Sequence, residues 1–248
     1  MAVVKACNTR IIVGGVDLSG DTNTVGVTIA GRNLEYGVLQ DCNTRRISLP
    51  PSSSIEHNGY YTGPDAGTID TVLRTYLAST TGVHVGVIFD TAATIPFAYV
   101  QDLAYNSRYN ANAQTGQLIT LAGNWPTLSG SGNQMIRGYQ CFGGTISGTG
   151  GQTGIDFGSA GSAGGRAYVF VTAITGTATS ATINIESDTD VGFGTAANEG
   201  TATFSAVGCQ EVALSGTVNR YVRLNCTSLG GATDFTVYGV VALSGVTY

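Results

Sequence analysis

The stretch "LEYGVLQDCNTRRISLPPSSSIEHNGYYTG", Leu34–Gly63, decides what fold the first half of the chain predicts. It begins with the alternation of a strand and then breaks into a polar segment that holds two adjacent arginines and two adjacent prolines. Extended structure resumes before Tyr60 and Tyr61. Two strands separated by a long polar segment, in a chain with so few charges, predict a protruding arm over about residues 39–57.

The segments on either side of this stretch predict two more strands and one helix. Residues 11–30 predict two strands around a polar turn, and Val25, Val27 and Ile29 alternate with small or polar residues as if one face were buried. The sequence "DAGTIDTVLRTYLAST" carries apolar residues at the i, i+3, i+4, i+7 spacing of an amphipathic helix. We therefore expect a helix over about residues 66–79, capped by Asp65 or Thr68.

The second half predicts only strands. Glycine and serine become dense after Pro126, and strand patterns separated by turn residues follow. The clearest are "RAYVFVTAI", "SATINIESD", "NRYVRLNC" and "DFTVYGVVAL", with a weaker one at "TATFSAV". Regular spacing of this kind is typical of a β-sandwich. The chain is therefore predicted to be mainly β, with a β-sandwich or barrel carrying one α-helix over residues 1–128 and an all-β sandwich domain over 129–248. We expect the first domain to assemble without the second.

The composition excludes several classes of function. Charged residues make up 11% of the chain, its formal net charge is −5, and Lys5 is its single lysine. No basic patch is present, so a protein that holds nucleic acid by neutralising phosphates is not predicted. A surface with so few charges is prone to self-association, which suggests that other subunits cover much of it. The sequence shows no signal peptide and no apolar run long enough to span a bilayer, and predicts a soluble chain made in a cytoplasm.

No catalytic, metal or cofactor site is predicted. The five cysteines lack metal-binding spacing, and they are expected to be reduced thiols, although a Cys209–Cys226 bridge is conceivable. His57 and His84 are expected to be structural. Glu186, Asp188 and Asp190 alternate as in a calcium loop but lack its further ligands, so we expect solvated acids on an edge strand. Trp125 and the tyrosines could form a sugar-stacking platform, although core packing explains them equally well.

The order of the early motifs resembles that of siphophage major tail proteins, the subunits of the tail tube. The resemblance rests on "VGGVDLSGDTNTVGV", "LEYGVLQDCNTRRI" and "GYYTGPDAGTIDTVLRTYL", in that order. The later "MIRGYQCFGGTISGTGGQTGIDFG" and the strands that follow are similar to the C-terminal Ig-like or lectin-like sandwich of longer members. The arm departs from the family pattern: "QDCNTRR" stands where Gly-Asp-Thr is common, and "LPPSSS" where a Pro-Gly turn is common.

This resemblance implies a structural virion protein of the phage tail. Copies, six in number by analogy, would form rings that stack into a hollow tube, and genome DNA would pass through the tube into the host without sequence-specific binding. The implied partners are further copies of the chain and the terminator, tape-measure and distal tail proteins, with assembly in the host cytoplasm and no membrane partner. The arm would contact the neighbouring ring or subunit through Gln40, Asp41, Asn43, Thr44, Arg45, Arg46, Leu49, Pro50 and Pro51. Carboxylates on the lumen would repel phosphates, and Asp17, Asp21 and Glu35 are the candidates.

Two hypotheses besides the tail-tube protein, which is the first, remain open. The second hypothesis is a binding module, namely a capsid decoration protein or a receptor- or glycan-binding tail component with a lectin-like sandwich. The third is a hydrolase of cell-wall polysaccharide, which would need an acid/base pair or nucleophile that the sequence does not reveal. The residues from about 134 onward would decorate the outside of the tube under the first hypothesis.

Overall fold

The computed structural model describes residues 8–36, 45–128 and 135–244, and it describes side chains outside residues 32–50. The chain forms two compact units that interleave along the sequence. The first unit comprises residues 1–20, 84–100 and 136–248, and the second comprises residues 21–83 and 101–135. The chain therefore passes between the units several times, whereas the sequence predicted one boundary after residue 128. The fold is mainly β with one helix, as predicted.

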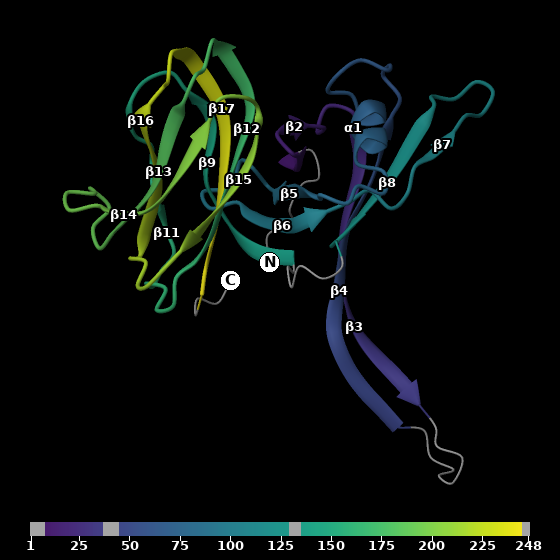
Figure 1. Ribbon diagram of the computed structural model, residues 1–248, viewed down its shortest axis with the longest axis horizontal. Helices are drawn as coiled ribbons and strands as arrows, with labels where there is room; N and C mark the ends of the chain where they lie inside the picture. The colour runs from purple at the N-terminus through teal and green to yellow at the C-terminus, as the bar shows by residue number, and fades with distance from the viewer. Residues whose placement is uncertain (1–7, 37–44, 129–134, 245–248) are drawn as a thin grey trace. The chain divides into compact units, whose positions relative to one another are not determined.

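The first unit contains a β-sandwich whose strands come from the second half of the chain (Figure 1). One sheet is eight-stranded, in the order β15-β12-β17-β9-β6-β5-β1-β2, and the other is five-stranded, in the order β10-β16-β13-β14 with β11 beside β16. The sandwich strands are β9 (Met135–Ile146), β10 (Gly150–Gly151), β11 (Ile155–Asp156), β12 (Gly165–Gly176), β13 (Ala181–Asp188), β14 (Ala197–Phe204), β15 (Gly208–Leu214), β16 (Tyr221–Ser228) and β17 (Ala232–Leu243). These strands confirm the strand patterns that were predicted from the second half of the sequence.

The eight-stranded sheet also takes in strands from the first half of the chain. These are β1 (Arg10–Val13), β2 (Val16–Asp17), β5 (Val83–Phe89) and β6 (Phe97–Ala104). Strand β6 lies next to β9 in the sheet, so hydrogen bonding is continuous between the two halves. The sheet that contains these strands therefore includes residues on both sides of the predicted boundary, since strands from after residue 134 complete it.

Two hydrophobic cores lie on the two faces of strand β12. Val169 and Val171 belong to the sandwich core, together with side chains of β13, β14 and β16. Tyr168 and Phe170 point to the other face, where they pack with Ile12, Ile88, Ala98, Val100, Tyr238 and Val240. Strand β12 is thus buried on both sides, which accounts for its unbroken apolar run "AYVFV".

The second unit is built on a four-stranded sheet in the order β3-β4-β8-β7. Its strands are β3 (Thr22–Tyr36), β4 (Arg45–Tyr60), β7 (Asn110–Asn112) and β8 (Thr120–Pro126). The helix α1 (Ile69–Thr75) buries Ile69, Val72 and Leu73, as its periodicity predicted. It is shorter than the predicted 66–79, because Ala78 has a positive φ of 55° and Leu77 forms a β-bridge with Asn106. Leu77, the last residue of the predicted apolar stripe, is exposed.

Cys141 and Cys226 are buried free thiols, so the conceivable bridge between Cys209 and Cys226 is absent. Burial raises the pKa of Cys141 to about 12 and also raises that of Cys226, which keeps both thiols protonated and unreactive at neutral pH. Cys7 and Cys42 lie outside the described residues. Within those residues, the structure has no helix with the length and apolar character needed to cross a bilayer.

Candidate functional site

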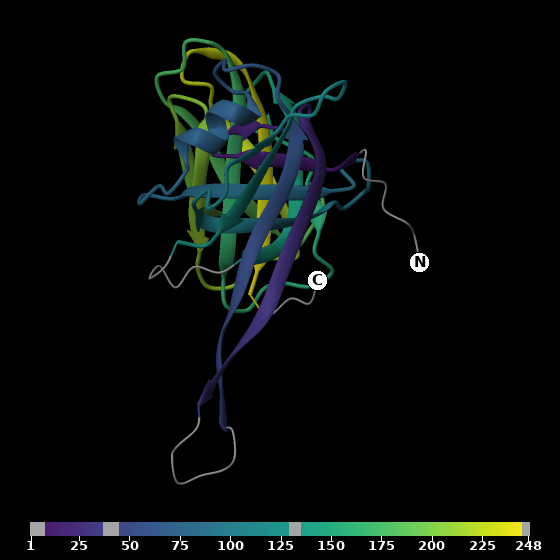
Figure 2. The ribbon, with the colours of Figure 1, turned by 90° about the vertical axis from the view of Figure 1, so that its right-hand side faces the viewer.

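The predicted arm is a long β-hairpin made by β3 and β4. The two strands pair in antiparallel fashion from Thr22 opposite Gly59 to Tyr36 opposite Arg45. Strand β8 pairs with β4 only from Ser54 to Tyr60. Within the described part of the chain, residues 45–53 of β4 are therefore paired on one side only, with β3, and the hairpin extends beyond the rest of its sheet (Figures 1 and 2).

The two prolines of the arm lie inside strand β4 and do not end it. Ala30 pairs with Ser52 and Arg32 pairs with Leu49, so Gly31 alone stands opposite Pro50 and Pro51. This two-against-one mismatch is a β-bulge, where an unpaired backbone position tolerates a residue that lacks an N–H donor. Within the arm predicted over about residues 39–57, the described residues from 45 onward form a strand and not an irregular polar segment, because the bulge accommodates both prolines and the strand continues on either side of them.

The predicted contact residues of the arm divide into two groups. Arg45, Arg46 and Leu49 pair with β3, Pro50 lies in the bulge of β4, and the side chains of these four residues are outside the description. Pro51 is exposed. The others, Gln40, Asp41, Asn43 and Thr44, lie outside the described residues. The contacts assigned to this set stay a prediction.

An apolar stripe on β3 is only partly covered. Val25 pairs with His57 and Val27 with Ile55, and both valines are half-buried. Ile29 pairs with Ser53, beyond the end of β8, and its side chain is 56% exposed. The expected burial of this whole face was therefore wrong at its outer end. The stripe therefore continues onto the two-stranded part of the hairpin, beyond the end of β8.

A buried histidine and the chain's single tryptophan lie at the root of the hairpin. His57 is 1% exposed and Trp125 is fully buried. The indole Nε1–H donates to His57 Nδ1 at 2.9 Å, and the two rings are stacked with their centroids 6.0 Å apart. Burial lowers the pKa of His57 to about 4. His57 is thus a structural residue that stays neutral at pH 7, and the burial of Trp125 excludes it as an exposed sugar-stacking surface.

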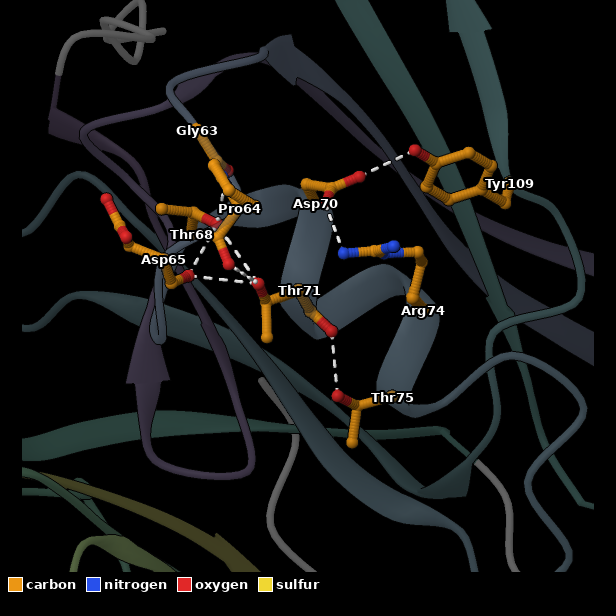
Figure 3. Close-up of polar contacts among 9 residues, drawn as sticks. All are labelled: Gly63, Pro64, Asp65, Thr68, Asp70, Thr71, Arg74, Thr75 and Tyr109. Atoms are coloured by element: carbon orange, nitrogen blue, oxygen red, sulfur yellow. Dashed lines mark hydrogen bonds and ion pairs between the residues drawn. The ribbon is translucent and has the colours of Figure 1, made fainter.

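The helix α1 rests against the hairpin root, and polar contacts fix the turn that leads into it (Figure 3). A Cβ at Gly123 would collide with Leu73, so the glycine allows the helix to approach the sheet closely. Thr68 is the N-cap, as predicted, but its hydroxyl makes no capping bond. That hydroxyl lies 2.9 Å from the Gly63 carbonyl and 2.8 Å from the Asp65 carbonyl, to which it donates. The contact closes the turn that leads into the helix.

A second set of contacts joins α1 to the residue that precedes β7. Asp70 is buried, pairs with Arg74 at 2.9 Å and accepts a hydrogen bond from the Tyr109 hydroxyl at 2.6 Å (Figure 3). The hydrogen bond to Asp70 raises the pKa of Tyr109, so this phenol remains a donor across the neutral range. This triad could not be predicted from the sequence, since only the helical spacing of Asp70 and Arg74 is visible without the fold.

Asn106 is a buried amide that joins the end of α1 to strand β8. Its Nδ2 donates to the Leu73 carbonyl at 2.9 Å, and its Oδ1 accepts from the backbone N–H groups of Arg108 at 3.2 Å and Asn124 at 3.3 Å. The Asn106 backbone also bonds to Tyr76 and Ala78. A helix end leaves carbonyls without intrahelical partners, and Asn106 satisfies one of them.

Replacing Asn106 with alanine is expected to destabilise the second unit by about 1–3 kcal/mol, because it leaves buried backbone groups without partners. Urea unfolding followed by the fluorescence of the single tryptophan, Trp125, measures this change in the unit concerned. Asn112→Ala, on the exposed strand β7, is the matched control and should stay within about 0.5 kcal/mol of the wild type. Equal losses in the two variants would contradict the role given to Asn106.

The three predicted lumen acids lie in different environments. Asp17 pairs with Arg10 and accepts from the Ser19 backbone N–H at 3.0 Å, so its charge is already compensated. Asp21 accepts from the Thr62 hydroxyl at 3.1 Å. Glu35 lies in β3 opposite Arg46, and its side chain is outside the description. Their exposure to a lumen stays a prediction.

The alternating acids of β13 are not solvated. Glu186 and Asp188 are buried, and β13 lies between β16 and β14, so it is not an edge strand. Glu186 accepts from Arg223 Nε at 2.9 Å and Asn225 Nδ2 at 2.5 Å, while Asp188 accepts from the Thr195 N–H at 2.9 Å. The expectation of solvated edge acids was wrong for Glu186 and Asp188, because these carboxylates have internal donors. Asp190, beyond the end of β13, is exposed as expected.

Comparison with known proteins gives only distant structural likenesses. No family model matches the chain, and no curated protein matches it in sequence. The PVC sheath/tube terminator of an extracellular contractile injection system is 10% identical, with a TM-score of 0.41 over 55% of this chain and 97% of its own. The SPP1 tail tube protein is 12% identical, with a TM-score of 0.39 over 54% of this chain and 78% of its own. The SPP1 Dit protein is 9% identical, with a TM-score of 0.34 over 95% of this chain and 99% of its own.

Proposed function

We propose that this chain is a structural protein of a phage tail, and that its copies form rings, six to a ring by analogy, which stack into a hollow tube for genome DNA. The observation that carries the proposal is the β3–β4 hairpin, whose outer part has no second neighbour among the described strands. A long unpaired edge is a template for pairing with another chain, and proteins that remain monomeric usually blunt such edges.

The chemistry of the hairpin supports an assembly role. Its apolar stripe ends in the exposed Ile29, which would gain from burial against another copy. Two arginines near its tip can each fork onto a carboxylate of a neighbour, and the adjacent prolines lower the entropy that ordering would cost. A head-to-tail contact of this kind closes into a ring when its rotation is right.

The sequence supports the same proposal through the order of its motifs, which resembles that of siphophage tail-tube subunits. The partners that follow from it are other copies of the chain, the terminator, tape-measure and distal tail proteins, and DNA in transit. The sandwich of the first unit would then lie outside the channel. The chain is proposed to act in the virion after assembly in the host cytoplasm, with no enzymatic step.

Negative-stain electron microscopy of the purified full-length chain tests the proposal. Rings or tubes with a central opening are expected. Discrete monomers or trimers at all concentrations would contradict it and would favour the alternative, a decoration or glycan-binding tail component.

The hairpin makes a more specific prediction. Arg45→Ala and Arg46→Ala should change the thermal unfolding midpoint little but raise the protein concentration at which tubes form, because the contacts proposed for these groups are with other copies. Arg108→Ala removes a positive charge from an exposed position outside the hairpin and is the control. Sedimentation measures tube formation. Wild-type assembly of both hairpin variants would show that the arginines make no contact between copies.

A further inference from the structure

The four-stranded sheet of the second unit has two unlike faces. On one face, Ile55, His57, Leu121 and Trp125 are buried, and α1 packs there through Ile69 and Leu73. The alternation of β4 and β8 places the intervening side chains on the other face, which we call the open face. It comprises Thr24, Gly26, Thr28, Ala30, Ser52, Ser54, Glu56, Asn58, Tyr60, Asn110, Asn112, Thr120, Ala122, Asn124 and Pro126.

Every residue of the open face is exposed or half-buried, over all four strands of the sheet. The cross-strand register makes it continuous, since Glu56 pairs with Gly26 on one side and with Asn124 on the other. A sheet face of this extent on which no residue is fully buried is either solvated in the monomer or turned toward a space that must stay hydrated.

The chemistry of the open face is small, neutral and polar. Hydroxyl and amide side chains dominate it, and Glu56 is the one charged residue in the set that defines it. None of its members is a lysine or arginine, so it offers no group that would release counterions from a phosphate backbone. It lacks the apolar anchors of a protein-binding surface, apart from Tyr60 at one end.

We infer that the open face is the wall of the channel, and that Glu56 is the residue that repels the DNA passing along it. The inference rests on the proposed function. If copies join their sheets edge to edge into a closed barrel, one face of each sheet must turn inward. The opposite face is already occupied by α1 and its core, which leaves the open face for the inside.

This assignment adds an uncompensated acid to the candidates for the lumen. Asp17 is neutralised by Arg10, whereas Glu56 forms no ion pair among the described residues. One carboxylate from each copy would form a ring of negative charge at each level of the tube. Such a ring, set in a hydrated neutral wall, repels phosphates without offering a site at which the polymer could stop.

A heavy-atom experiment on assembled tubes locates the open face directly. Thr28→Cys places a thiol on the open face of β3, and Leu77→Cys places a matched thiol beyond α1, on the other side of the sheet; both positions are exposed. Tubes of each variant and of the wild type are treated with a small mercurial, and difference maps are calculated by helical averaging. The wild-type map subtracts the native cysteines.

Density on the channel surface for Thr28→Cys, and at a larger radius for Leu77→Cys, is the expected result. Density for Thr28→Cys on the outside of the tube or between rings would overturn the inference and leave the proposed function standing. Failure of the wild-type chain to form tubes would instead contradict the proposed function.

The charge of Glu56 is tested on the same tubes. Glu56→Lys should make them retain a short fluorescent DNA duplex at low salt and release it steeply as salt rises, because each new cation adds a counterion-release step. Wild-type and Glu56→Gln tubes should retain at least tenfold less. Equal retention by intact tubes of all three would overturn the role given to Glu56.

Discussion

A fragment of residues 1–133 is expected to lose the structure of β1, β5 and β6. In the full chain, β6 pairs with β9, and Ile12, Ile88, Ala98 and Val100 pack against side chains of β12 and β17. Removing residues 134–248 takes away Tyr168, Phe170, Tyr238 and Val240 from this core. Four such side chains contribute roughly 6–12 kcal/mol of burial, which approaches the roughly 5–15 kcal/mol total stability of a domain.

Far-ultraviolet circular dichroism and limited proteolysis of the fragment measure this loss. We expect cleavage within residues 8–17 and 84–100, while the second unit, which lies wholly before residue 136, keeps the fluorescence of buried Trp125. Co-expression of residues 1–133 with 134–248 is the control, since the two pieces contain every strand of the shared sheet. A fragment that melts cooperatively at the temperature of the full chain would contradict the shared core.

Local patterns predicted the elements that depend on near neighbours. The strand β12 follows from its apolar run, and α1 follows from the spacing of Ile69, Val72 and Leu73. The end of α1 could not be predicted in the same way, because Leu77 continues the apolar stripe and is diverted by a bridge to Asn106. Propensity is a weak guide wherever a distant residue supplies the competing hydrogen bond.

Long-range pairing was the main feature that the sequence did not contain. Nothing near β6 or β9 indicates that the two strands are neighbours, so a single domain boundary between them was a reasonable but wrong expectation. The effect of Pro50 and Pro51 could not be predicted for a different reason. A proline pair usually ends a strand, whereas here it occupies a bulge opposite Gly31. The length of the hairpin was therefore underestimated.

The buried polar residues were also invisible to pattern analysis. Asn106 and Asp70 have ordinary local contexts, and their importance comes from what the fold brings to them, namely the Leu73 carbonyl and the Tyr109 hydroxyl. His57 was expected to be structural, and its neutral state follows only from its burial beside Trp125. The open face could be predicted only in part. The alternation of side chains in β8 is visible in the sequence, but the pairing of β8 with β4 is not.

Acidification is expected to weaken the hairpin root through His57. In the unfolded chain this imidazole has its ordinary pKa of 6.5, whereas burial lowers the pKa to about 4 in the folded chain. The unfolded state therefore binds the proton first. The full contribution to stability is present above pH 6.5, falls as the pH drops toward 4, and changes no further below that value.

The contact between His57 and Trp125 explains why protonation of the imidazole is unfavourable. Nδ1 accepts the hydrogen bond from Trp125, so the neutral ring carries its proton on Nε2, which has no hydrogen-bond partner in the described structure. Protonation of Nδ1 would set two donors against each other and bury a charge. Since each unit of pKa shift corresponds to about 1.4 kcal/mol, the expected loss between pH 7 and pH 4.5 is roughly 2–3 kcal/mol.

Urea unfolding at a series of pH values, followed by Trp125 fluorescence, measures the loss where it arises. His57→Gln is the matched control: its amide oxygen can accept the indole N–H, but it does not titrate. The variant should start from a lower stability at pH 7 and lose roughly 2–3 kcal/mol less than the wild type on acidification to pH 4.5. Subtracting the two profiles removes the contribution of carboxylates that titrate in the same range. Parallel profiles would mean that His57 is not the group that makes the root of the hairpin sensitive to acid.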